Sequence, residues 1–176
     1  VTGTGTPKIT AKFEAGKDRE VTVEDPVNKV SLAFKPRFSV ARPKKNVNRI
    51  VYPLNNLDGT VVYSIKSVGI KEDFLLRTVG RDKLSFSYDL DLSDGLEARL
   101  DKEGWLGVYG TSAPLYGNVA TGSDQDAALL DKARKAAKKD KLLFRIPAPF
   151  IKEHGNHKSR AMAWFTLEDG KMLTVH

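Results

Sequence analysis

The stretch LSFSYDL, residues 84–90, alternates apolar and polar side chains without a break. Successive side chains of a β-strand point to opposite faces, so this pattern predicts a half-buried antiparallel strand. Its apolar set faces a core, and the serines and Asp89 face solvent. The same alternation recurs at residues 9–13, 30–34, 61–65 and 96–100.

Turn signals separate these segments at short intervals. Asp58-Gly59, Asp94-Gly95 and Asp169-Gly170 supply the positive φ angles that tight hairpin turns need. The last of them predicts a hairpin of residues 161–167 and 172–175 about a turn at 168–170. We therefore expect an all-β fold, an antiparallel two-sheet β-sandwich of about ten to twelve short strands.

One segment, residues 123–141, departs from the alternation and predicts an α-helix. Ser123 is placed to cap its start, acidic residues follow at once, and lysines gather at the far end, which suits the helix dipole. We interpret it as an accessory helix packed on a sheet edge or at the mouth of the sandwich. A partner-binding or membrane-surface helix is the alternative. Residues 42–48 and 110–122 read as linkers.

The length of 176 residues suits one domain. We expect a flexible lead-in at 1–7, left by processing, and a single sandwich domain at 8–176 with a loop-helix insertion at about 110–141. The chain has no cysteine, which excludes disulfides, Cys-ligated zinc and a thiol nucleophile.

The net charge of +7 is unevenly distributed. Residues 26–57 hold seven Lys/Arg and no acid, whereas residues 72–103 are rich in Asp and Glu. Such polarity steers anionic partners. The basic stretch 35–49 is thus a candidate polyanion-binding segment, and its candidate residues are Arg37, Arg42, Lys44, Lys45 and Arg49. Phe34 and Phe38 are interleaved with the cations and suit either base stacking or a core. The alternative is a solvated edge strand that lysine and proline protect from edge pairing.

Other clusters carry weaker signals. Asp89, Asp91 and Asp94 place oxygen ligands at calcium-like spacing, but the EF-hand pattern fails, and we interpret them as a strand face running into a turn. His154 and His157 are too few for a zinc site. The glycines of residues 104–110 do not form a phosphate loop. A last set of aromatic residues suits either sandwich packing or a sugar platform: Trp105, Tyr109 and Tyr116. We assign no catalytic residue, metal ligand or cofactor.

The order of several short elements resembles the β-rich N-terminal module of large secreted RHS-type and related wall-associated bacterial proteins. The matching pieces are Ile50-Val51-Tyr52, residues 61–65, residues 69–73, residues 84–90, residues 94–100, Glu103-Gly104 and residues 144–149. The helix between Tyr109 and Leu142 departs from the family's pattern, which has a short turn there, and so does the strongly basic stretch around Lys44-Lys45. The resemblance implies a non-catalytic structural module of a longer extracellular chain, with no catalytic residues to transfer.

We therefore expect a non-catalytic structural or interaction module of an exported bacterial cell-surface or secreted protein. Its partners are then other domains of the same chain or neighbouring surface proteins. A domain that binds an anionic polymer or glycan through residues 35–49 is the alternative. An enzyme whose acidic residues come from distant strands, without a sequence motif, is a third.

Overall fold

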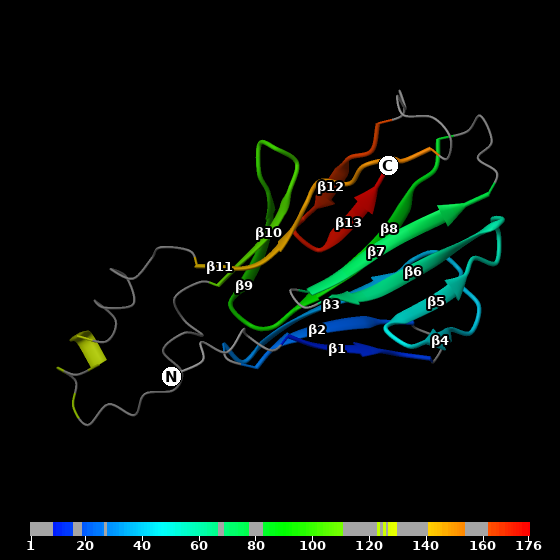
Figure 1. Cartoon of the computed structure of the whole chain (residues 1–176). Helices are drawn as coiled ribbons and strands as arrows, with labels where there is room; N and C mark the ends of the chain where they lie inside the picture. Colours follow the sequence, from blue (N-terminus) through cyan, green and yellow to red (C-terminus); the bar gives the residue numbers. More distant parts are fainter. Residues whose placement is uncertain are drawn as a thin grey trace, which may run out of the picture. The chain divides into compact units, whose positions relative to one another are not determined.

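The computed structural model describes residues 9–15, 19–26, 28–66, 69–77, 83–110, 123, 125, 127–129, 141–153 and 162–176. This part of the chain is almost entirely antiparallel β-structure, with thirteen strands and one short helix (Figure 1). The chain divides into two compact units, Val1–Asp91 with His176, and Leu92–Val175. We describe each unit by itself.

The first unit contains two sheets. One holds, in spatial order, β1 (Thr10–Phe13), β2 (Val21–Asp25), β3 (Val30–Pro36) and β8 (Phe86–Leu92). The other holds β4 (Lys44–Asn46), β5 (Arg49–Pro53), β6 (Gly59–Lys66) and β7 (Gly69–Leu76), each antiparallel to the next. Both sheets are meanders for most of their length, because short turns join strands that are neighbours in sequence.

The core of the first unit lies between these two sheets. Val21 from β2 packs in one cluster with Tyr52 from β5 and with Val61 and Tyr63 from β6. Phe13 of β1 lies 5.4 Å from Tyr63, ring centroid to ring centroid. The alternation in each strand thus seals one sheet against the other, and the predicted sandwich is confirmed here.

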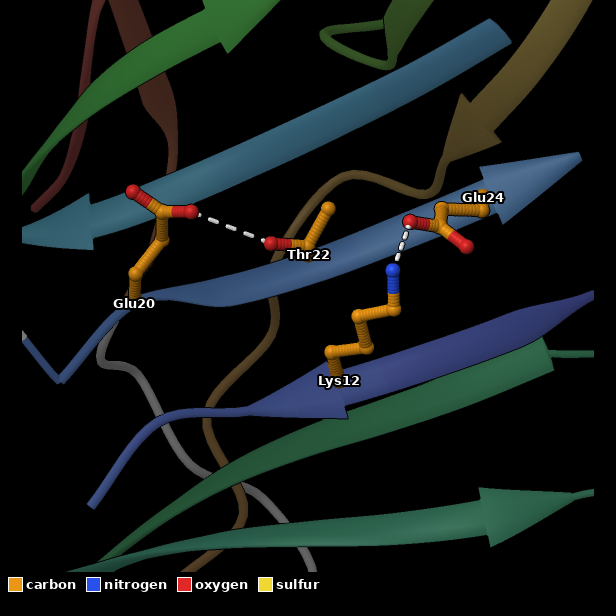
Figure 2. A network of polar contacts seen from close by, with 4 residues as sticks. All are labelled: Lys12, Glu20, Thr22 and Glu24. Atoms are coloured by element: carbon orange, nitrogen blue, oxygen red, sulfur yellow. Dashed lines mark hydrogen bonds and ion pairs between the residues drawn. The ribbon is translucent and has the colours of Figure 1, made fainter. Parts of the chain in front are cut away.

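The opposite face of the β1–β2 hairpin is polar (Figure 2). Lys12 of β1 forms an ion pair with Glu24 of β2, and the Thr22 hydroxyl donates a 3.0 Å hydrogen bond to Glu20. Lys12 and Glu24 belong to diagonal positions of the ladder, because Lys12 is opposite Thr22. Val21, which lies between Glu20 and Thr22 in sequence, points to the core, as period-two alternation requires.

The second unit contains a three-stranded sheet and a hairpin. The sheet has the order β11 (Lys141–Ile146), β10 (Leu106–Gly110), β9 (Leu96–Leu100), and the hairpin pairs β12 (Phe165–Glu168) with β13 (Met172–Val175). Leu106 and Val108 of the central strand are fully buried on one face. The β10–β11 register shifts between Val108 and Tyr109.

The predicted strands are confirmed, with corrected ends. In β8 the inward set Phe86, Tyr88 and Leu90 is buried, although the strand begins at Phe86 and not at Leu84. The C-terminal hairpin is present, but β12 begins at Phe165 and includes Glu168. Its Asp169-Gly170 turn has φ angles of 50° and 66°, as the dipeptide predicts.

The linker prediction for residues 42–48 was wrong. Residues 42–48 are not a linker, because residues 44–46 form β4 and residues 47–48 the turn into β5. Edge strands need only one pairing partner and tolerate lysine, so a short polar segment can be a strand. The alternative interpretation of the basic stretch, a solvated edge strand with lysines, fits β4, which lies at the edge of its sheet, whereas Lys35 and Pro36 belong to β3, which lies between β2 and β8.

The helix is present at the start of the predicted segment. Residues 125 and 127–129 are helical, and the Ala127 N–H donates a 3.1 Å hydrogen bond to the Ser123 carbonyl. Lys141, predicted as the last helical residue, instead begins β11. The remainder of 123–141, residues 1–7, residues 111–122, and His154 and His157 lie outside the described residues.

Candidate anion-binding surface

The β4–β5 hairpin carries most of the predicted cationic residues. Its register places Lys44 opposite Val51, Lys45 opposite Ile50 and Asn46 opposite Arg49, so only two residues make the turn. Ile50 and Tyr52 of β5 face the core, so Arg49, which alternates with them, projects from the outer face of the sheet. Lys44 projects from the same outer face, because it is opposite Val51. Lys45 projects from the other face, at the free edge of the sheet.

The hairpin is held firmly at both ends. At its base the Ala41 N–H donates a 2.7 Å hydrogen bond to the Pro53 carbonyl, and Val40 forms an antiparallel bridge with Leu54. At its tip the Ile65 N–H of β6 donates a 2.9 Å hydrogen bond to the Asn48 carbonyl. The cations are therefore presented by an ordered backbone, which lowers the entropy lost when a partner binds.

The cations of the hairpin are exposed, and no acidic residue among those the structure describes forms an ion pair with them. Arg42, Lys44, Lys45 and Arg49 are all exposed, and within the described ranges none of the four forms an ion pair. Elsewhere in the same unit lysines are neutralised, as in the pairs Lys12–Glu24 and Lys71–Asp73. The sequence explains the contrast, since residues 26–57 contain no Asp or Glu.

Arg37 is placed differently from the other predicted residues. It follows β3 and forms an ion pair with Asp89 of β8, with Nη2 2.7 Å and Nε 2.8 Å from the same carboxylate oxygen. Its N–H also donates to the Ser87 carbonyl. Arg37 thus ties β3 to β8 and stands apart from the hairpin cations.

The structure also shows the surroundings of two other candidate residues, Asp89 and Phe38. Asp89 is engaged by Arg37, and in the part of the chain that the structure describes no three acidic or imidazole side chains gather as a metal site. Phe38 is a core residue, with its ring 5.2–5.7 Å from Phe74, Phe86 and Tyr88. It therefore does not serve as an exposed platform for bases.

The sequence did not predict a hydrogen-bonded cluster of one glutamate and two tyrosines between the two sheets of the first unit. Glu72 of β7 lies opposite Tyr63 on the core-facing side, between Ile70 and Phe74 in the alternation. Tyr88 of β8 donates a 2.9 Å hydrogen bond to Glu72 Oε1, and Tyr63 also hydrogen bonds to this carboxylate. Although Glu72 is exposed as a residue, desolvation of its carboxyl group beside Tyr63 and Tyr88 raises the pKa of Glu72, and the two tyrosine hydrogen bonds lower it in part. The only sequence signal was an acid at an inward position of an alternating strand.

This cluster leaves little room for a ligand. Tyr63 and Tyr88 are buried, and this burial together with the charge of Glu72 raises the pKa of both phenols well above its usual value. A cavity beside Tyr63, lined also by Tyr52, Phe38 and Arg19, has a volume of about 10 Å³, which is room for about one water molecule. The arrangement suits a structural hydrogen-bond network between the sheets.

In the second unit, an arginine lies over the ring of each of two aromatic residues of the predicted sugar platform. The guanidinium carbon of Arg145 lies 3.9 Å from the Trp105 ring centroid, and that of Arg99 lies 5.2 Å from the Tyr109 centroid. Tyr116 lies outside the described residues. Arg145 was not predicted, because it is forty positions from Trp105 in sequence and only sheet pairing brings them together.

Comparisons with protein families, curated proteins and solved structures found no match to this chain. Over the described residues, no helix has the length and apolar character needed to cross a membrane. The resemblance to RHS-type modules and the expected extracellular location therefore stay predictions, and the function is argued from the geometry of this chain.

Proposed function

We propose that this chain is a non-catalytic interaction module that binds an anionic polymer through the β4–β5 hairpin. The observation that supports the proposal is a set of four exposed cations that form no ion pair within the described ranges: Lys44, Lys45 and Arg49 on the hairpin and Arg42 two residues before it. Repeated negative charge is the chemistry that such a surface attracts, and release of counterions from the polymer drives the binding.

The arrangement of the cations favours an extended polymer over a small anion. Lys44 and Arg49 lie on the outer face of the sheet and Lys45 on the other, so they do not converge on one point. Each side chain is exposed and reaches a different charge along a chain. Surface ion pairs of this kind are individually weak, and affinity comes from their number.

The role of the module within a longer exported bacterial chain is part of the same proposal. An all-β unit with a basic edge attaches its parent chain to an acidic surface polymer or to a neighbouring acidic protein. The resemblance to RHS-type modules supports this setting, and it implies no catalytic residue in the module.

The test is heparin-affinity chromatography of the whole chain and of two charge-matched double variants. Lys44→Glu/Lys45→Glu and the control Lys83→Glu/Lys171→Glu both reduce the net charge from +7 to +3, since each substitution removes two units (7 − 4 = 3). All four lysines are exposed, so both variants should fold. The hairpin variant should elute at much lower salt than the control. Equal elution of the two variants would show that only net charge matters and would refute the proposal.

A further inference from the structure

The sheet formed by β4, β5, β6 and β7 has two edges of different kinds. β4 forms one edge with only three residues, all exposed and two of them lysines, and Pro43 precedes it. Short length, lysine and proline are features that protect a sheet edge from pairing with another chain. β7 forms the other edge with eight residues, contains no proline and pairs with β6 in continuous register. The β7 edge therefore lacks most of this protection.

The backbone of β7 presents hydrogen-bonding groups along its outer edge. The Arg77 N–H, directly after β7, donates a 2.9 Å hydrogen bond to the carbonyl of Asp58, directly before β6. Hydrogen-bonded pairs alternate along an antiparallel ladder, so Arg77 and every second residue before it are bonded toward β6. The residues between them direct their N–H and C=O groups away from β6, and within the described ranges no strand pairs with them: Ile70, Glu72, Phe74 and Leu76.

The side chains at the C-terminal end of β7 are self-complementary. Asp73, Leu75 and Arg77 alternate with core-facing Phe74, so they lie together on the outer face of the sheet. Leu75 is 57% exposed, although it is a large apolar residue. The Arg77 side chain is 83% exposed and approaches Asp58 only to 3.9 Å. An acid, an apolar residue and a base in this order match the same three residues read in the opposite direction.

We infer that β7 is a dimer interface, at which two copies of this chain pair antiparallel about a two-fold axis between their Leu75 residues. In this register Asp73 lies opposite the partner's Arg77, once on each side of the axis. Phe74 and the partner's Leu76 exchange backbone hydrogen bonds, and their side chains meet on the core-facing side. The contact is isologous, so it closes as a dimer and uses both β7 edges.

Charge selects this register over its neighbours. An axis at Glu72 or at Asp73 would place two identical carboxylates opposite each other. An axis at Phe74 would place Lys71 opposite the partner's Arg77. Like charges in directly opposite positions destabilise a strand pair, whereas both charged pairs of the proposed register are attractive. Lys71 binds Oδ1 of Asp73, and within the described ranges Oδ2 has no partner, so this oxygen can accept a hydrogen bond from the partner's Arg77.

The dimer joins two four-stranded sheets into one sheet of eight strands, with a β4–β5 hairpin at each end. Two hairpins on one sheet hold a long polymer at two places, a consequence that rests on the proposed function. Dimerisation itself does not rest on it and is measured without a polymer.

The test is sedimentation equilibrium of the whole chain from micromolar to millimolar concentration. We expect the average mass to rise from that of one chain toward that of two. Asp73→Arg and Arg77→Asp each place like charges opposite one another twice, and each should weaken the dimer at least about tenfold. Lys171→Asp makes the same charge change as Arg77→Asp in the β12–β13 turn and should leave the dimer unchanged.

Mixing the two weakened variants separates a broken interface from a damaged fold. An equimolar mixture of Asp73→Arg and Arg77→Asp brings opposite charges together at both positions, so it should dimerise although neither variant alone does so well. The hairpin variant Lys44→Glu/Lys45→Glu should dimerise as the unmodified chain does. A constant monomer mass, a dimer that both single variants leave intact, a mixture that stays monomeric, or loss of the dimer in the hairpin variant would each overturn the inference.

Discussion

Val61→Ala should destabilise the first unit by about 2.5–3 kcal/mol. Val61 is only 1% exposed and packs in the inter-sheet cluster with Val21 and Tyr52. Removing two buried methyl groups costs about 1.6 kcal/mol of transfer free energy. The cavity left between two paired sheets cannot close fully, which adds about 1 kcal/mol.

The matched control is Val51→Ala on the neighbouring strand. Val51 is opposite Val62 in the β5–β6 ladder, projects from the outer face and is only partly buried, so its loss should cost about 1 kcal/mol or less. Urea unfolding followed by far-ultraviolet circular dichroism measures both free energies, with the m value expected to be unchanged. If Val51→Ala costs as much as Val61→Ala, the face assigned to the core is wrong.

Three further predictions address single positions. Glu72→Gln should gain stability relative to the unmodified chain as pH rises above about 4.5. Burial makes the folded state keep the Glu72 proton to higher pH than the unfolded state, so unmodified stability falls through that window; parallel stability–pH curves for the two proteins would contradict this. Val47→Asn should stabilise the hairpin by about 1 kcal/mol, because Val47 is 90% exposed and has a φ of 43°, a left-handed value that asparagine tolerates; an unchanged or lower melting temperature would count against it. Gly59→Ala should destabilise by about 1–3 kcal/mol, since the new methyl group would lie 2.7 Å from the Leu75 carbonyl oxygen; a wild-type urea midpoint would refute the close approach.

Local patterns in the sequence predict the strands well where one face is buried. Phe86, Tyr88 and Leu90 alternate with polar residues, and the structure buries all three. The Asp169-Gly170 turn follows from the conformational freedom of that dipeptide. Residues 44–46 show no such pattern, because an edge strand with exposed residues on both faces needs no apolar set.

Side-chain partners across strands are not visible in the sequence. Arg37 was predicted beside Lys44, but a strand pairing gives it Asp89, fifty-two positions away. Glu72 meets Tyr88 because the two sheets pack face to face, and Arg145 meets Trp105 through the pairing of β10 with β11. Charge composition therefore indicates that residues 26–57 lack acids, whereas only the register shows which cations stay unneutralised.

The salt dependence of binding tests the central claim most directly. We would measure the dissociation constant for a fluorescently labelled heparin fragment between about 50 and 200 mM salt, for the unmodified chain and for Lys44→Glu/Lys45→Glu. Four hairpin cations predict a log–log slope of up to about 3, and the variant should lose about 1–2 of it. Identical slopes for the two proteins would contradict the proposal that the β4–β5 hairpin holds the polymer.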